Sequence, residues 1–157
     1  MSLIDKHINK DNLHHAYLIE GVRDEITPEV FVFLENIGVK TSGNSDFIHV
    51  VMDSLKIKDA LNIKARSLER PISEDKKVFI ISVNNFLIEA QNTLLKMFEE
   101  PIENTMFFLI VPDSSIILPT LLSRLNVIKL KNNTTINQKQ AEEFLKMSPS
   151  DRIAFIK

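Results

Sequence analysis

The sequence predicts an α/β fold in which helices cover both faces of a parallel β-sheet, giving a three-layer domain. One observation is a set of short, nearly continuous apolar runs rich in β-branched residues, at positions 16–19, 47–52, 78–83, 107–111 and 127–130. Runs of this kind are typical of strands that are buried on both faces. A second observation is that helical patterns separate the runs. Parallel neighbours need crossover connections, and these are usually helices.

The clearest helical pattern lies between the second and third runs. Its apolar residues recur three or four positions apart and predict an apolar face made of Ile57, Ala60, Leu61, Ala65 and Leu68. This helix should end before Pro71. Another helix is predicted for residues 89–98.

The helix after the first strand has its own start signal. Thr27 is a suitable N-cap, and Pro28 then occupies the first helical position. We therefore expect this helix to begin at Pro28, continue through residues 30–37 and stop at Gly38.

Composition limits the classes of protein to consider. The chain has 157 residues, 44% of them hydrophobic, which is enough for one sizeable core and a fragment of a second domain. A net charge of −2 argues against a surface devoted to nucleic acid. The absence of cysteine excludes disulfides and cysteine-based zinc sites. No window reaches membrane-spanning length, and we expect a cytoplasmic protein without membrane contact.

The domain division follows a change in composition near residue 131. We assign residues 1–131 to the core domain, because residues 131–135 turn polar. Residues 132–157 then form a linker and the beginning of a small helical domain, with a short amphipathic helix at about 138–147. The apolar Ile153, Phe155 and Ile156 near the end suggest a helix face made for further sequence, so we expect a fragment of a longer protein.

Gly21 follows the first predicted strand, where a phosphate-binding loop lies in many nucleotide-binding domains. Such a loop reads Gly-x-x-x-x-Gly-Lys-Ser/Thr. In this chain the second glycine, the lysine and the hydroxyl positions hold Ile26, Thr27 and Pro28. These residues alone favour an ordinary strand-to-helix loop with no link to nucleotides.

Other residues also oppose phosphate and magnesium chemistry. Asp24 and Glu25 place negative charge in the loop segment. The third apolar run ends at Ser82 and Val83, where a magnesium-binding domain would carry acidic residues. The tip of the following run holds Val111 where a polar residue would sense the terminal phosphate.

Three segments together carry a resemblance to a known family. Residues 15–18 read His-Ala-Tyr-Leu, residues 90–101 read Ala-Gln-Asn-Thr-Leu-Leu-Lys-Met-Phe-Glu-Glu-Pro, and residues 120–124 read Thr-Leu-Leu-Ser-Arg. The chain resembles the bacterial clamp-loader family, the AAA+ machines that open sliding DNA clamps, over about residues 13–131. Taken singly, Glu99 and Glu100 are an ordinary solvated helix end; only the continuous pattern is diagnostic.

The resemblance implies an AAA+-type core with a degenerate nucleotide site, followed by the start of the lid domain. It also implies a role for Arg124, which in the family reaches across a subunit interface into the ATP site of a neighbour. Ser123 and Arg124 of the family's Ser-Arg-Cys motif are retained, with Ser123 supporting the arginine, whereas Leu125 replaces the cysteine. A Ser-Arg dipeptide considered alone would indicate a solvated or locally paired arginine.

The resemblance also bears on metals and cofactors. The family's usual four-cysteine zinc module is missing, since only residues 38–45 stand in its place. The four histidines are too irregularly spaced to replace it: His7, His14, His15 and His49. We expect no metal and no cofactor.

These observations suggest a subunit of the DNA polymerase III clamp loader that does not hydrolyse ATP and that supplies an arginine finger. The resemblance implies a hetero-pentameric ring with ATP-binding subunits and a clamp-opening subunit, an indirect link to the sliding clamp, and primed DNA reached through the assembly. Two alternatives stay open: an ATP-hydrolysing subunit of the same loader, and an AAA+-like interaction scaffold outside replication. Four basic residues of one predicted helix could contact DNA directly: Lys56, Lys58, Lys64 and Arg66. A solvated helix face is the more favoured interpretation of these charges.

Overall fold

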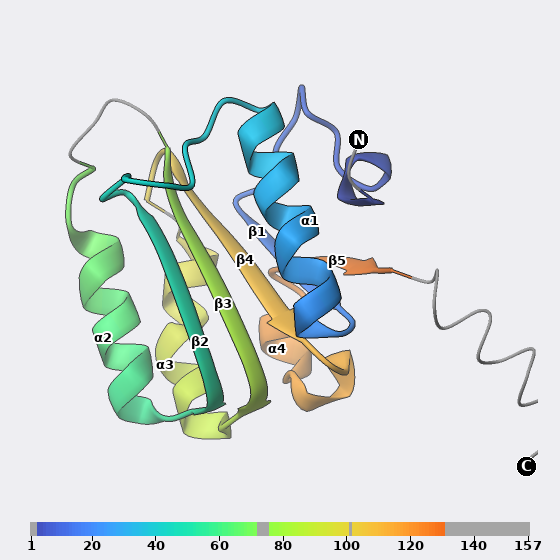
Figure 1. Cartoon of the computed structure of the whole chain (residues 1–157). Coiled ribbons are helices and arrows are strands. Elements are labelled where there is room, and N and C mark those ends of the chain that lie inside the picture. The colour runs from blue at the N-terminus through green and yellow to red at the C-terminus, as the bar shows by residue number, and fades with distance from the viewer. Residues whose placement is uncertain (1–2, 72–75, 101, 131–157) are drawn as a thin grey trace, which may run out of the picture.

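The computed structural model describes residues 3–71, 76–100 and 102–130, so the expected lid segment 132–157 lies outside the described residues. The fold alternates strands and helices (Figure 1). The strands are β1 (Ala16–Glu20), β2 (Phe47–Leu55), β3 (Lys77–Phe86), β4 (Thr105–Val111) and β5 (Asn126–Lys129). The helices are η1 (Leu3–Lys6), α1 (Arg23–Asn36), α2 (Ile57–Leu68), α3 (Ile88–Glu99), η2 (Ser114–Ile116) and α4 (Pro119–Leu122). All five predicted strands are present, with small differences at their ends.

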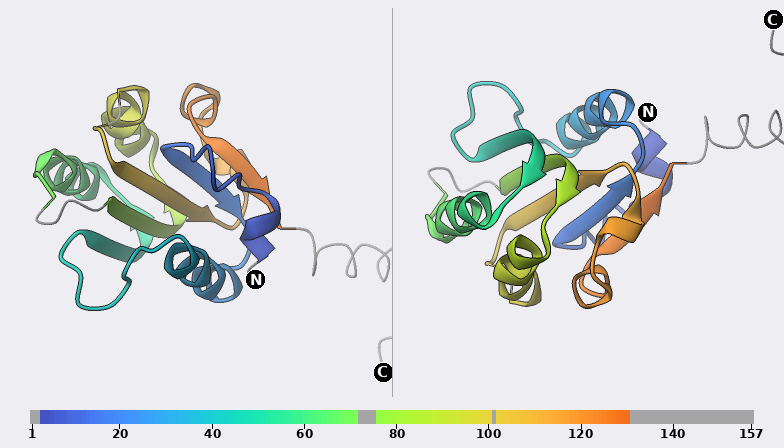
Figure 2. Two further views of the ribbon diagram at one scale, coloured as in Figure 1. Left: turned by 90° about the horizontal axis from the view of Figure 1, so that it is seen from above. Right: turned by 90° about the horizontal axis from the view of Figure 1, so that it is seen from below.

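The strands form one parallel sheet in the order β2-β3-β4-β1-β5. Helix α1 covers one face, and α2, α3 and α4 cover the other (Figure 2). Each face has its own apolar core, because alternate residues of a strand point to opposite sides. In β4, Phe107 and Leu109 join the core under α2 and α3, whereas Phe108 and Ile110 join the core under α1. The predicted three-layer α/β architecture is therefore confirmed.

Helix α1 corrects one prediction. It begins at Arg23 rather than at Pro28, and Pro28 lies inside it. The amides of Glu25 and Ile26 both donate to the carbonyl of Val22, at 3.1 and 3.0 Å, which starts the helix early. Pro28 lacks the N–H that would bond the carbonyl four residues earlier, but it is exposed, so water can solvate that carbonyl.

The end of α1 agrees with its stop signal. The helix ends at Asn36 and Gly38 adopts a positive φ of 90°. The amide of Gly38 donates to Glu35 O at 3.1 Å and that of Val39 to Leu34 O at 2.9 Å. This pair of bonds is the Schellman motif, in which glycine avoids the steric cost of a left-handed conformation.

Helix α2 has its predicted bounds but a different buried face. It buries Ala60, Ile63 and Ser67, whereas Leu61 and Leu68 are 54% and 66% exposed. The helix covers the edge of the sheet above β2 and packs beside α3 (Figure 2), so only a narrow stripe of it faces the protein. Its C-terminal end is held by Lys77, whose ammonium donates to the carbonyls of Arg66 and Glu69. A cation at this end also interacts favourably with the helix dipole.

Gln91 is the buried polar residue that joins three elements. Its amide nitrogen donates to Phe86 O at 2.9 Å and Ile116 O at 2.8 Å, and its amide oxygen accepts from Leu118 N at 2.7 Å. The side chain is 1% exposed. Gln91 therefore fixes the end of β3 and the η2–α4 connection against α3, and α4 leads directly to Arg124.

We expect Gln91→Leu to lower the free energy of unfolding by roughly 2–4 kcal/mol, because buried backbone groups that bond the amide lose their partner. Urea denaturation followed by circular dichroism measures this change. Asn92→Ala is the matched control, since Asn92 is exposed on the same helix and should change stability by less than about 0.5 kcal/mol. Equal effects of the two substitutions would contradict the anchoring role of Gln91.

Candidate functional site

A hollow of about 480 Å³ lies at the carboxyl edge of the sheet. It is bordered by the residues that follow β1, by the start of α1, and by the ends of β3 and β4: Gly21, Val22, Arg23, Asp24, Val83, Asn84, Ile110, Val111 and Pro112. Ligands of open α/β sheets bind at this edge, beyond the carboxyl ends of the strands. This is the place where the family resemblance implied a degenerate nucleotide site.

The loop itself is shorter than predicted. Helix α1 starts at Arg23, so Ile26, Thr27 and Pro28 lie on helical turns and not in a loop. Ile26 is 2% exposed and packs against the backbone of Gly21, where an added Cβ would approach Ile26 Cδ1 to 2.6 Å. The space beside Gly21 is therefore filled by a hydrocarbon side chain.

The magnesium positions are also apolar or neutral. Val83 and Val111 are buried in the core under α2 and α3. Ser82 is fully buried, and its hydroxyl has no hydrogen-bond partner among the described residues. None of these three side chains carries the charge that would bind a divalent cation.

Arg23 was not predicted from the sequence, where Asp24 and Glu25 were the only charged residues of this segment to be considered. Its Nη2 donates to Met52 O at 3.0 Å and to Ser82 O at 3.4 Å. The guanidinium therefore bonds the C-terminal halves of β2 and β3 beside the hollow. Burial lowers the pKa of His49, and the positive charge of Arg23 lowers it further. No sequence signal distinguishes such an arginine from an exposed one at a helix start.

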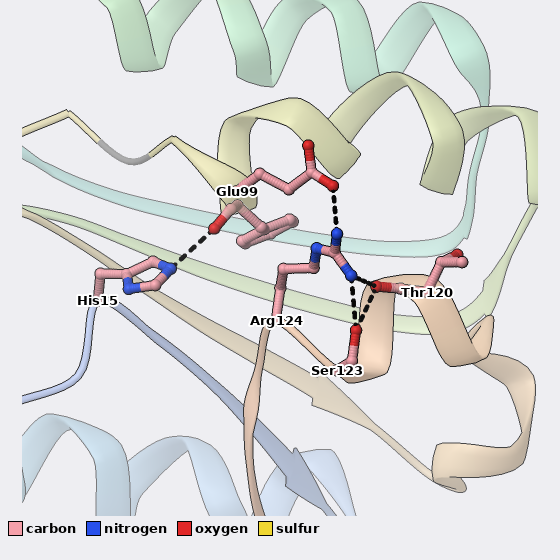
Figure 3. Close-up of polar contacts among 6 residues, drawn as sticks. His15, Glu99, Thr120, Ser123 and Arg124 are labelled. Carbon is pink, nitrogen blue, oxygen red and sulfur yellow. Dashed lines mark hydrogen bonds and ion pairs between the residues drawn. The ribbon is translucent and has the colours of Figure 1, made fainter.

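Arg124 lies between α4 and β5 and is paired within its own chain (Figure 3). Its Nη2 contacts Glu99 Oε1 at 2.6 Å. Its Nη1 donates to Thr120 O at 3.0 Å and to Ser123 Oγ at 2.7 Å. The side chains of Arg124 and Glu99 are 39% and 37% exposed, so the pair is accessible to solvent. Glu99 is thus more than the solvated helix end that its sequence suggested.

Ser123 and Leu125 have different surroundings on either side of Arg124. Ser123 donates its hydroxyl to Thr120 O at 2.9 Å and accepts from Arg124 Nη1 at 2.7 Å, and its predicted support of the arginine stays a prediction. Leu125, which takes the place of the family's cysteine, is 8% exposed and packs in the core under α2 and α3.

His15 fixes the end of α3 close to this pair (Figure 3). Its Nε2 lies 2.8 Å from the carbonyl oxygen of Phe98, the residue before Glu99. Burial lowers the pKa of His15, although its hydrogen bond to that carbonyl acts in the opposite direction. A neutral His15 therefore connects the start of β1 to the helix that carries Glu99.

The Arg124–Glu99 pair lies near the amino ends of the strands, whereas the hollow lies at their carboxyl ends. Asn126, two residues after Arg124, pairs with Tyr17 at the start of β1, whereas Gly21 follows the end of β1. The five residues of β1 separate the two edges by roughly 16 Å at about 3.3 Å per residue. Arg124 therefore does not reach the hollow of its own chain.

Other predicted features are spread out or lie elsewhere. Among the described residues, no group of three or more histidines or acidic residues is arranged to hold a metal ion. The described helices include none that is long and apolar enough to cross a membrane. The basic residues of α2 are exposed or half-buried and do not line the hollow: Lys58, Lys64 and Arg66.

Known proteins match this chain in sequence and in fold. The family described as "DNA polymerase III, delta subunit" matches residues 34–134. The delta-prime subunit of DNA polymerase III from Bacillus subtilis is 33% identical over an alignment 148 positions long, and the match covers 79% of this chain and 44% of that protein. The chain belongs to the DNA polymerase III delta-prime subunit family. It spans less than half the length of this curated relative.

Two solved structures have the same fold as this delta-prime family member. A DNA polymerase III gamma subunit-related protein from Thermotoga maritima matches with a TM-score of 0.60 and 25% identity, over 74% of this chain and 41% of that one. The clamp loader delta protein of Bacillus subtilis matches with a TM-score of 0.57 and 14% identity, over 88% of this chain and 47% of that one. At 14% identity the second match supports the fold alone.

The lowered pKa of His15 predicts a pH dependence of stability. The unfolded chain takes up a proton near pH 6.5, whereas the folded chain resists protonation, so stability is lost as the pH falls below about 6.5. His15→Gln should reduce the fall in unfolding free energy between about pH 7.5 and pH 5.5, measured by urea denaturation. Asn92→Ala, at an exposed position without a titratable group, is the control and should leave the fall unchanged. An unchanged fall in His15→Gln would contradict the prediction.

Proposed function

We propose that this chain is the core part of a clamp-loader subunit that does not hydrolyse ATP and that places Arg124 in the ATP site of a neighbouring subunit. The observation that carries the proposal is the position of Arg124. Its half-exposed guanidinium lies at the sheet edge opposite the hollow of its own chain. At this position the guanidinium cannot contact a nucleotide in the hollow of its own chain. It can contact only a nucleotide that a neighbouring subunit binds.

The chemistry of arginine suits this role. A guanidinium is planar, permanently charged and rich in N–H donors, so it can neutralise charge that develops on a transferring phosphoryl group. Where arginine fingers act in trans, they accelerate hydrolysis by about 10³- to 10⁵-fold. The hydroxyl of Ser123 and the carbonyl of Thr120 hold one end of the side chain, which reduces the conformational freedom that such a contact would cost.

Four features of the chain's own hollow favour a subunit without ATPase activity, with an AAA+-type core whose nucleotide site is degenerate. Ile26 fills the space beside Gly21, and the helix begins where a phosphate loop would be. Ser82, Val83 and Val111 provide no carboxylate for magnesium. The guanidinium of Arg23 is already bonded to the carbonyls of Met52 and Ser82. These features count against the alternative of an ATP-hydrolysing subunit.

Family membership supports the wider setting of the proposal. The full-length protein would act in a hetero-pentameric ring with ATP-binding subunits and a clamp-opening subunit, and it would help to load the sliding clamp on primed DNA. Contact with the clamp is then indirect, and contact with DNA is shared by the assembly. The other alternative, a scaffold outside replication, would leave Arg124 without any effect on a partner's ATPase.

The finger assignment predicts that Arg124→Ala in the full-length protein lowers the ATPase rate of the reconstituted clamp loader at least tenfold. Arg124→Lys should restore little of the rate, because lysine keeps the charge but loses the planar fork. Arg70→Ala, which removes an exposed arginine of the same chain, is the control. Assembly is measured by size-exclusion chromatography, and an unchanged ATPase rate of an assembled Arg124→Ala loader would rule out the finger.

The degenerate hollow predicts that the chain alone binds no magnesium-ATP. Isothermal titration calorimetry, at protein concentrations sufficient to detect sub-millimolar affinity, should give only heats of dilution. A parallel titration of an ATP-binding subunit of the loader serves as the positive control. Saturable binding to this chain would instead favour the ATP-hydrolysing alternative.

A further inference from the structure

We propose that Glu99 is a positioning residue for Arg124: its carboxylate fixes the plane of the guanidinium and so directs the free N–H groups of Arg124 toward the neighbouring subunit. This inference rests on the proposed function and extends it to a residue on a different helix. Glu99 is the last residue of α3, and it meets Arg124 from 25 positions away in the sequence (Figure 3).

The three contacts of the guanidinium differ in how far they restrict the orientation of its plane. Thr120 O and Ser123 Oγ both bind Nη1, and both belong to the same short segment as Arg124. Contacts to a single nitrogen leave the plane of the guanidinium free to turn about it. Glu99 Oε1 binds the other terminal nitrogen, Nη2, at 2.6 Å. Two nitrogens of a rigid planar group held by different elements define its plane.

The contacts also determine which donors remain for a partner. A guanidinium has five N–H donors. Nη1 is bonded to Thr120 O and Ser123 Oγ, and Nη2, which carries two hydrogens, is bonded to Glu99 Oε1 alone among the described residues. The Nε–H and one Nη2–H therefore have no acceptor within residues 3–71, 76–100 and 102–130. Two N–H groups of one fork are what a phosphate accepts in a bidentate contact.

Glu99 stands on a rigid base, which a positioning residue needs. Phe98, just before it, is fully buried, and its carbonyl is bonded to His15. Gln91, two turns earlier on α3, ties that helix to the connection that leads into α4. The carboxylate and the arginine are thus carried by elements that are fixed to each other.

The energetics favour a directional role over a stabilising one. An ion pair between two half-exposed side chains contributes about 0–1 kcal/mol to folding. The loss of Glu99 should therefore leave the fold intact. Orientation matters far more at a reacting phosphate, where a small misplacement can lower the rate by about 10²-fold.

The test is a double-mutant cycle in the reconstituted clamp loader, with the full-length protein carrying Glu99→Ala, Glu99→Gln, Arg124→Ala or both alanine substitutions. We expect Glu99→Ala to lower kcat about five- to twentyfold with little change in the KM for ATP. Glu99→Gln keeps an oxygen acceptor for Nη2 and should restore the rate to within about twofold. The double variant should be as slow as Arg124→Ala alone, because Glu99 acts only through Arg124.

Glu100→Ala is the matched control, since Glu100 is the adjacent exposed glutamate and has no contact with Arg124 in the described structure. A wild-type rate in Glu99→Ala, together with a slow Arg124→Ala, would overturn the positioning role and leave the finger standing. A wild-type rate in Arg124→Ala would overturn both.

Two further outcomes would also overturn the inference. Rates above wild type in both Glu99 variants would mean that the carboxylate competes with the neighbour's phosphate for the guanidinium. An additional loss when Glu99→Ala is combined with Arg124→Ala would mean that Glu99 acts through another group.

Discussion

The pairing of β1 with β4 on one side and β5 on the other is the constraint on which the rest of this structure depends. β1 is buried on both faces, and its register sets Gly21 at one edge of the sheet and the Ser123–Arg124 turn near the other. A one-residue slip of this register would move every side chain of β1 to the opposite core. The separation between the hollow and Arg124 is therefore a property of the ladder itself and not of any loop.

A small number of polar contacts then connect the helices to this frame. Gln91, His15 and Lys77 each bond a backbone carbonyl of another element with a side chain that is buried or half-buried. Such bonds contribute modestly when made, but they are costly to leave unmade inside a core. They fix the positions of α2 and α3 relative to the sheet more precisely than apolar contacts alone, which are not directional. The contacts of His15 and Gln91 hold α3, which carries Glu99, against the start of β1 and the connection that leads to Arg124.

The sequence predicted much of the fold, because its strongest signal is the burial of whole strands. Runs such as residues 107–111 are apolar on both faces and indicate parallel pairing without any tertiary information. The start of α1 was predicted wrongly, since the preference of proline for the first helical turn is a local tendency that the packing of Ile26 against Gly21 overrides. The face of α2 was predicted wrongly except for Ala60, because periodicity does not reveal which stripe of a helix at the edge of a sheet is covered.

The candidate site was predictable only in part. Ser123 and Arg124 were identified from their pattern, yet their assignment to a neighbour's ATP site stays a prediction. Arg23 and the pairing of Glu99 were not foreseen. Both depend on contacts between segments that are far apart in the sequence, 29 positions for Arg23 and Met52 and 25 for Glu99 and Arg124. No local pattern encodes such contacts.

The packing of Ile26 against Gly21 has a consequence for the history of this chain. With a methyl group of Ile26 beside its backbone, this glycine is needed for the packing alone, so its presence does not indicate a nucleotide. A lysine introduced at position 27 would project from a helical turn, and a glycine introduced at position 26 would leave a hole in the core under α1. Each single change is thus without benefit or harmful, so a phosphate-binding loop could form at this place only through several changes at once. In evolutionary terms, the packing of Ile26 makes a gradual route to nucleotide binding here very difficult.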